Sequence, residues 1–203
     1  MVVPSRSEAA ALLVRFSPQD WFLAHVAAVA DIAAGLGRAF KGRGHPVDLG
    51  LIEAAALLHD IDKILPPPER PPLPHGAAGA RWLSQIGHPE LAEAVASHPV
   101  TELARDQRSP WWEAAPAETR IVAYADKRAG QRLQPMASRF ADWRGRHPEH
   151  AADLARAWPR ALRLEALICG QAGLAPDQVG RLRWARRALS DAGPPDGHRG
   201  GRT

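Results

Sequence analysis

The dipeptide His59-Asp60, which ends an apolar run, is the sequence feature that most limits how this chain can fold. Residues 52–58 read Ile-Glu-Ala-Ala-Ala-Leu-Leu, which is typical of a helix that packs in a core. An imidazole and a carboxylate at the end of such a helix are costly to bury unless both groups find partners. A metal ion is the usual partner for this combination, so the dipeptide predicts a buried polar site beside the core.

The hydrophobic pattern predicts an all-α protein, because apolar residues recur at helical spacing and no alternating run is long enough for a sheet. Residues 66–74 hold six prolines and should form an extended loop, and residues 99–115 form a polar connection. Pro159 should either begin a new helix or kink the old one. We expect helices at residues 19–37, from an N-cap at Asp48 to residue 59, and at 76–86, 90–97, 117–133, 137–146, 149–171 and 177–191.

The length of 203 residues favours a single domain with one sizeable core. We expect a helical bundle over residues 1–173 and a C-terminal helical extension over residues 174–192 that packs on the bundle or prolongs it. A tail over residues 193–203, rich in Gly, Pro and Arg, should be disordered.

Composition points to a cytoplasmic protein that does not enter a membrane. Cys169 is the only cysteine, which excludes an intramolecular disulfide, and the N-terminus lacks the features of a signal peptide. Every apolar stretch is interrupted by a charged residue or His before the roughly 20 residues that a span needs. The net charge is −3 over residues 1–127 and +7 over residues 128–203. The basic part could attract phosphorylated ligands, although solvation of helices by arginine is the preferred interpretation.

Four polar residues interrupt the apolar stripes of four separate predicted helices: His25, His59, His98 and Asp126. Helical neighbours three and four positions apart share a face, so all four side chains should point toward the core. A single buried His usually has an ordinary hydrogen-bonding role, but a buried Asp needs a partner that offsets its desolvation. A shared metal cavity explains the four positions together.

The order His25, His59-Asp60, Asp126 resembles the HD superfamily of metal-dependent phosphohydrolases. The segments HVAAVADIAAGLG, EAAALLHDIDK and IVAYADK are similar to the first, second and last motifs of that family, and the resemblance covers about residues 20–172. It implies an HD-domain helical bundle in which His25, His59, Asp60 and Asp126 bind one metal ion.

Two further histidines, His75 and His98, lie between the His-Asp pair and the final Asp. This fuller order resembles HD proteins that hold two metals, including symmetric diadenosine tetraphosphate hydrolases and HD-GYP phosphodiesterases. The resemblance implies that His75 and His98 bind a second ion and that Asp60 bridges the two. One or two ions per chain are therefore expected, and Fe, Mn, Zn, Mg, Co and Ni are not distinguished.

The chain departs from the family pattern at two places. Many relatives have His-Asp-Ile-Gly-Lys, whereas here Asp62 replaces the glycine and adds a negative charge. The diadenosine tetraphosphate hydrolases follow the last Asp with an acidic-proline-arginine segment, which is missing after Asp126. The remaining histidines are interpreted as surface residues: His45, His88, His147, His150 and His198.

The predicted activity is hydrolysis of a phosphate ester or phosphoanhydride in a small phosphorylated substrate, with a nucleotide favoured. Asp60 and Lys63 are the expected catalytic residues, and Lys63, Lys127 and Arg128 are the candidates for binding phosphate. A narrower alternative is a diadenosine polyphosphate or dinucleotide hydrolase. Another is a non-catalytic HD module that binds a nucleotide or RNA for regulation. Binding of nucleic acid is the less favoured expectation, and the sequence does not predict the oligomeric state.

Overall fold

A computed structural model describes residues 3–105 and 110–180, and within these ranges the chain is helical with no β-strand. The all-α prediction is therefore confirmed for this part of the chain. The helices are α1 (Arg6–Val14), α2 (Asp20–Gly42), α3 (Leu49–Leu58), α4 (Ala77–Gln85), α5 (Ala92–Ser97), α6 (Val100–Ala104), α7 (Trp111–Ala114), α8 (Ala117–Lys127), α9 (Met136–Arg146) and α10 (Ala151–Ala172). Short 3₁₀ turns are η1 (Ile61–Lys63), η2 (Pro89–Leu91), η3 (Pro148–His150) and η4 (Pro176–Gly180).

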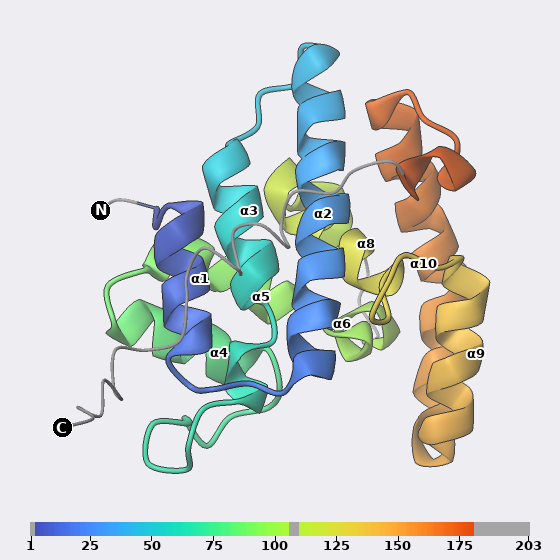
Figure 1. Ribbon diagram of the computed structural model, residues 1–203. Coiled ribbons are helices and arrows are strands. Elements are labelled where there is room, and N and C mark those ends of the chain that lie inside the picture. Colours follow the sequence, from blue (N-terminus) through green and yellow to red (C-terminus); the bar gives the residue numbers. More distant parts are fainter. Residues whose placement is uncertain (1–2, 106–109, 181–203) are drawn as a thin grey trace, which may run out of the picture.

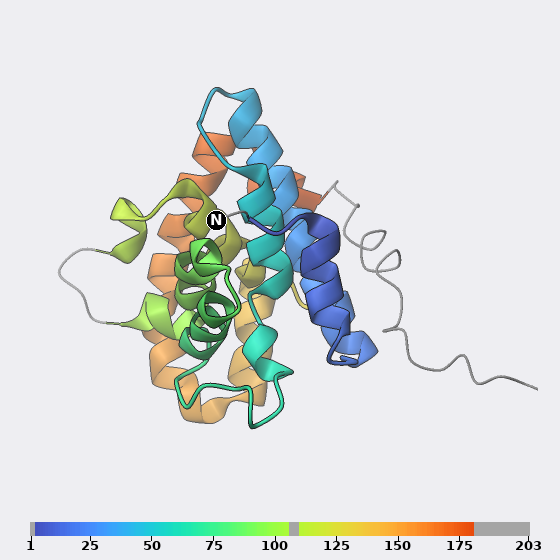
Figure 2. The same cartoon turned by 90° about the vertical axis from the view of Figure 1, so that its left-hand side faces the viewer.

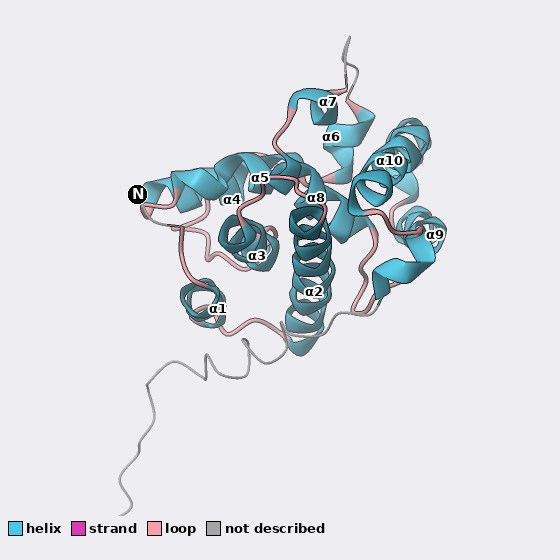
Figure 3. Ribbon diagram, turned by 90° about the horizontal axis from the view of Figure 1, so that it is seen from above, coloured by secondary structure: helices cyan, strands magenta, loops and turns pink. Residues whose placement is uncertain are grey.

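Helix α2 lies at the centre, with α3 packed on one side and α8 on another (Figure 1). Seen from above, α2 and α3 run nearly parallel to the line of sight, and α4 and α5 follow one another along one flank (Figure 3). Helices α9 and α10 contact each other on the opposite side from α1 (Figures 1 and 3). The polar cluster described below lies where the ends of α3, α5 and α8 approach the N-terminal half of α2.

Helix α2 is long and apolar enough in composition to cross a bilayer, which the count of uninterrupted apolar residues did not indicate. However, 67% of its most apolar window is buried inside the protein. Burial of this kind is typical of the core helix of a soluble protein, and apolar contacts with the surrounding helices account for the composition of α2.

Several local predictions agree with the structure. Asp48 caps α3, because its side chain accepts a hydrogen bond from the Leu51 amide. The proline-rich residues 66–74 form no helix and make a loop at the base of the view in Figure 2. This loop returns the chain from η1 to His75, which brings that residue back beside the end of α3.

Other predictions need correction. Helix α1 was not anticipated, although Ser5 and Glu8 form a reciprocal capping box that marks its start. Helix α8 ends at Lys127 rather than at residue 133, because the chain turns there and Ala129 pairs with Leu133 in an isolated bridge. Helix α10 continues through Pro159 as one element. Most of the helix expected at 177–191, and the whole tail 193–203, lie outside the residues that the structure describes.

Candidate metal centre

Two histidines of the cluster end the helices that carry them. His59 follows α3 and His98 follows α5, and each places Nδ1 against a carbonyl three residues earlier. The distances are 2.8 Å from His59 to Ala56 O and 2.6 Å from His98 to Val95 O. Carbonyls in the last turn of a helix lack helical partners, so these rings satisfy them by donating from Nδ1. Each ring therefore presents Nε2, without hydrogen, to the space beyond its helix.

The other two histidines are held in the same tautomer by partners distant in sequence. His25 of α2 donates from Nδ1 to Gly130 O, at 2.8 Å, in the turn after α8. His75 places Nδ1 3.0 Å and 3.1 Å from the two carboxylate oxygens of Asp62. The His75 hydrogen bond lowers the pKa of Asp62 although burial acts in the opposite direction, so this carboxylate is ionised and accepts. All four rings thus present Nε2 to the site.

Glycines allow the second pair of histidines to approach. Gly76 follows His75 with φ +81°, and a Cβ there would lie 2.6 Å from Pro99 Cγ. A Cβ at Gly79 would lie 3.2 Å from side-chain atoms of both Ile61 and Val95. Side chains at these positions would push α4 away from η1 and α5, and would separate His75 from His98.

The four rings form two pairs, and Asp60 lies between the pairs. His25 Nε2 and His59 Nε2 are 3.2 Å apart, at 3.4 Å and 3.5 Å from Asp60 Oδ2. His75 Nε2 and His98 Nε2 are 3.1 Å apart, and both are 3.3 Å from the other oxygen, Asp60 Oδ1. One carboxylate therefore offers one oxygen to each pair. This placement suits a carboxylate that bridges two ions, which is the role that the resemblance implies for Asp60.

Asp126, near the end of α8, completes the first group of ligands. Its Oδ1 lies 3.5 Å from His25 Nε2 and 3.8 Å from His59 Nε2. The cluster thus consists of His25, His59, Asp60 and Asp126 on one side, and His75, His98 and Asp60 on the other. His59, Asp60 and His98 are at most 2% exposed, whereas the His75 side chain is 35% exposed.

The donor set fits metal ions on grounds of hydrogen-bonding chemistry. Four imidazole lone pairs and two carboxylates converge, and all of these groups are acceptors. Asp60 Oδ1 is buried, and while the Nε2 atoms around it carry no hydrogen it has no hydrogen-bond donor among the described residues. Lone pairs this close repel one another unless a cation lies between them, and a mixed imidazole and carboxylate set suits first-row transition ions. The residues present could therefore hold one ion at each pair.

The protonation equilibria of the metal-free protein show the same demand for positive charge. Burial opposes ionisation of Asp60, but the surrounding imidazoles hold the pKa of its carboxyl well below the ordinary range. Burial lowers the pKa of His59 to about 3, so this ring is neutral. Burial acts in the same direction at His75, yet hydrogen bonds with Asp60 and Asp62 raise its pKa to about 9. A proton on His75 Nε2 therefore occupies the position that an ion would take at the second pair.

The three predicted phosphate-binding cations lie in different surroundings. Lys63 Nζ is 2.8 Å from Asp60 Oδ2, and its side chain is 45% exposed at the mouth of the cluster. Lys127 is fully buried, pairs with Asp126 Oδ2 at 3.0 Å and donates to His98 O. Its ammonium group thus fixes the positions of two ligand-bearing segments.

Arg128 is also buried, and its donors are used by groups away from the cluster. Its guanidinium bonds to Tyr124 OH at 2.5 Å, Glu165 Oε1 at 3.0 Å and Pro176 O at 2.8 Å. Arg128 therefore ties α8 to α10 and to the segment after it. Neither Lys127 nor Arg128 lines the cavities described next, so a direct phosphate contact by either residue stays a prediction from the sequence.

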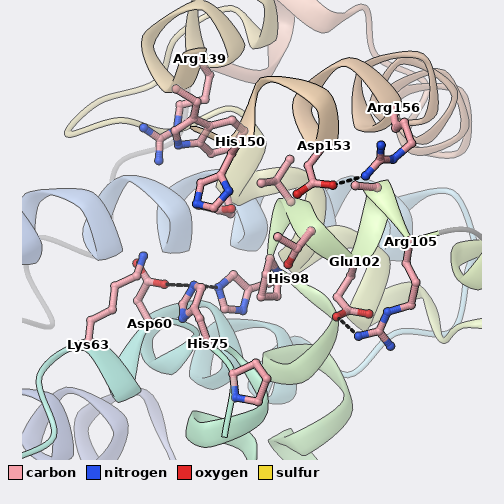
Figure 4. A pocket seen from close by; sticks show the side chains of 17 residues that line it. Asp60, Lys63, His75, His98, Glu102, Arg105, Arg139, His150, Asp153 and Arg156 are labelled. Atoms are coloured by element: carbon pink, nitrogen blue, oxygen red, sulfur yellow. Dashed lines mark hydrogen bonds and ion pairs between the residues drawn. The ribbon is translucent and has the colours of Figure 1, made fainter. Parts of the chain in front are cut away.

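Two cavities open on the cluster, one on each pair of histidines. The first, of about 920 Å³, lies between α6, α9 and α10 and reaches Asp60, His75, His98 and Asp126; we call it the α6–α10 cavity (Figure 4). The second, of about 820 Å³, lies between α2 and α9 and reaches His25 and Asp60; we call it the α2–α9 cavity. Both are lined by Asp60, Lys63, Arg139 and Trp143, so they meet above the Asp60 carboxylate.

Sequence reasoning missed several of these residues. Asp62 was noted only as a departure, although a carboxylate two residues after Asp60 was the available signal for a partner to a ligand histidine. Arg139 and Trp143 carried no signal, because only tertiary packing of α9 brings them over the site. His147 and His150 were predicted to be surface residues and are exposed, yet each lines one of the cavities.

Comparison with known proteins agrees with this geometry. The family described as HD domain matches residues 22–130, which is more than half of the 203 residues. The chain belongs to the HD domain family. This HD domain chain is also similar to an uncharacterized protein of Methanocaldococcus jannaschii, with 31% identity over 109 residues, or 50% of the chain. The match spans 62% of that protein's length, which is less than two thirds. No solved structure matches the chain.

Proposed function

We propose that this HD domain protein is a hydrolase that cleaves a phosphate ester or phosphoanhydride of a nucleotide or another small phosphorylated substrate. HD domains indicate a superfamily of metal-dependent phosphohydrolases, which supplies the reaction class. The observation that carries the proposal is the position of Asp60, with one carboxylate oxygen 3.3 Å from each member of one histidine pair and the other oxygen beside the second pair. Such an arrangement suits two ions that share a ligand beneath an open cavity.

Bound divalent ions would supply Lewis acidity and lower the pKa of a water molecule toward neutrality. The residues of the chain would do the remaining work. The four histidines, Asp60 and Asp126 would hold the ions. Lys63, at the mouth of the cluster, neutralises negative charge that develops on the phosphoryl oxygens.

A narrower candidate is a diadenosine polyphosphate or dinucleotide hydrolase. The observation that favours it is the meeting of the two cavities above Asp60, which leaves room for a substituent on each side of a phosphorus atom. The missing acidic-proline-arginine segment after Asp126 separates this chain from the diadenosine tetraphosphate hydrolases known by that motif. The two cavities therefore favour a phosphate that carries a substituent on each side, but they do not indicate that either substituent is adenosine.

The test is metal analysis of the purified protein, followed by a hydrolysis screen of phosphomonoesters, phosphodiesters and nucleotides with and without a chelator. We expect metal-dependent release of phosphate or of a nucleotide, abolished by chelation and by Asp60→Ala. Glu93→Ala, an exposed carboxylate on α5, is the matched control and should keep parental activity. Metal-loaded protein that cleaves none of these compounds but binds a nucleotide tightly would replace the proposal with the regulatory alternative.

A further inference from the structure

Arg139 of α9 faces the cluster from the side opposite its ligands. It lines both the α6–α10 and the α2–α9 cavity, as Lys63 does, but it projects from the helix across the cavity (Figure 4). A group bound above Asp60 would thus have Lys63 on one side and Arg139 on the other. Residue 139 lies beyond the 22–130 segment matched by the family, so the match assigns it no role.

Arg139 differs from the other cations of the α6–α10 cavity in its partners. Lys63 pairs with Asp60, and the exposed arginines of this cavity pair with acids three residues earlier in the chain: Arg105 with Glu102, and Arg156 with Asp153. In the described part of the chain, the Nε of Arg139 is buried and has no hydrogen-bond partner. A buried guanidinium donor without an acceptor is unfavourable, which calls for an anion at this position.

The contact between Arg139 and Trp143 explains how the guanidinium is held but provides no acceptor. Arg139 Cζ lies 4.4 Å from the centroid of the Trp143 ring, which is a cation–π distance. Stacking on a ring uses the flat face of a guanidinium and leaves the N–H groups at its edge available. Two such donors match two oxygens of a phosphate, so the stacked side chain is prepared for bidentate binding.

The net electrostatics of the position also favour an anion. Burial lowers the pKa of Arg139, and the nearby carboxylates of Asp126 and Asp60 oppose that change. Both carboxylates are the candidate metal ligands, so bound ions would neutralise them and leave Arg139 with less compensation. A phosphoryl group placed between the ions and Arg139 would restore the balance of charge.

We propose that Arg139, stacked on Trp143, is a substrate-phosphate ligand of this site and holds a phosphoryl group against the metal cluster from the α9 side. The inference rests on the proposed function for its choice of phosphate as the anion. It makes α9, a helix outside the matched HD segment, part of the substrate site. Trp143 is then a positioning residue, because it touches the guanidinium and sets its plane.

The experiment measures binding of inorganic phosphate to the metal-loaded protein by calorimetry, which requires no catalytic activity. Arg139→Gln should weaken phosphate binding by about 10- to 100-fold, the effect of losing a charge-assisted bidentate hydrogen bond. Arg144→Gln removes the same charge from the same helix at an exposed position that lines neither cavity, and should stay within about twofold of the parent. Metal content and helical circular dichroism are measured for every variant.

Phosphate binding within twofold of the parent in Arg139→Gln, or an equal loss in Arg144→Gln, would overturn the inference. If Arg139→Gln loses metal or helicity, Arg139→Lys decides, because it keeps the charge without the planar fork. With fold and metal retained, phosphate binding by Arg139→Lys at least threefold weaker than in the parent supports the role, and parental binding refutes it. If the protein hydrolyses a substrate but binds phosphate equally well without Arg139, the proposed function stands and the role of Arg139 is refuted. If phosphate binding depends on Arg139 but no hydrolysis is found, the role of Arg139 stands and the proposed function does not.

Discussion

Acidification should weaken metal binding at the His75–His98 pair. In the metal-free protein His75 has a pKa of about 9, raised by its hydrogen bonds with Asp60 and Asp62 against the effect of burial. Below that pH the ring carries a proton on Nε2, and an ion must displace it. The affinity for metal at this pair therefore falls as the pH falls below about 9, and the displaced proton is released to the buffer.

The magnitude follows from the distance between this pKa and the working pH. At pH 7, two units below the pKa, the neutral ring is about one hundredth of the population, so apparent affinity drops about 100-fold, or about 2.7 kcal/mol. His59, with a pKa of about 3, is already neutral and adds no such dependence at the other pair. Asp62→Asn weakens a hydrogen bond that raises the His75 pKa and should make the affinity depend less on pH.

Calorimetric titration with Mn²⁺ between pH 6.5 and 8.5, in buffers of different ionisation enthalpy, measures affinity and proton release together. About one proton should accompany the weaker binding event at pH 7, and its affinity should rise about tenfold per pH unit. His75→Ala should lose this event and keep the other. A pH-independent second event, or unchanged proton release in His75→Ala, would contradict the assignment of the proton to His75.

Three further predictions concern the ligands and their surroundings. Metal stoichiometry should approach two per chain and fall toward one in either His75→Ala or His98→Ala, as measured by elemental analysis; an unchanged value of one with full activity would leave a single-ion site. Asp60→Ala should lose nearly all activity together with metal, whereas Lys63→Ala should keep its metal and lower turnover by about 10²–10³, and parental turnover would make Lys63 only a surface cation. Tyr124→Phe removes a buried hydroxyl that contacts Glu165 and Arg128, and thermal unfolding should report a loss of about 1–3 kcal/mol; no loss would mean that this network adds nothing to stability.

Four of the candidate ligands stand out in the sequence because each of them interrupts or ends a helical pattern of apolar residues. His25 and Asp126 interrupt apolar stripes, and His59 and His98 each end a helix whose last carbonyls need donors. Asp62 could not be assigned in the same way, because its contact with His75 depends on the path of the loop over residues 66–74. This contact forms only when the loop brings His75 back to Asp62, and no local sequence pattern specifies that return.

The cavity walls were outside the reach of sequence reasoning for a related reason. Arg139 and Trp143 belong to a helix whose position is set by packing against α10, and both side chains resemble ordinary surface or core residues in the sequence. The length of α8 was overestimated because residues 128–133 continue a tolerable helical pattern. The hydrogen bonds of Arg128 to Gln134 O and Pro176 O belong instead to the turn that ends α8.

The hydrogen bonds that orient the four histidine rings are of two kinds, and this difference affects how the site can change by mutation. Three histidines are oriented by main-chain carbonyls, at Ala56, Val95 and Gly130, which a substitution of side chain does not delete. Only His75 is oriented by a side chain, that of Asp62. A single codon change at position 62 would therefore alter how the His75 ring is held and leave the carbonyl partners of the other three rings in place.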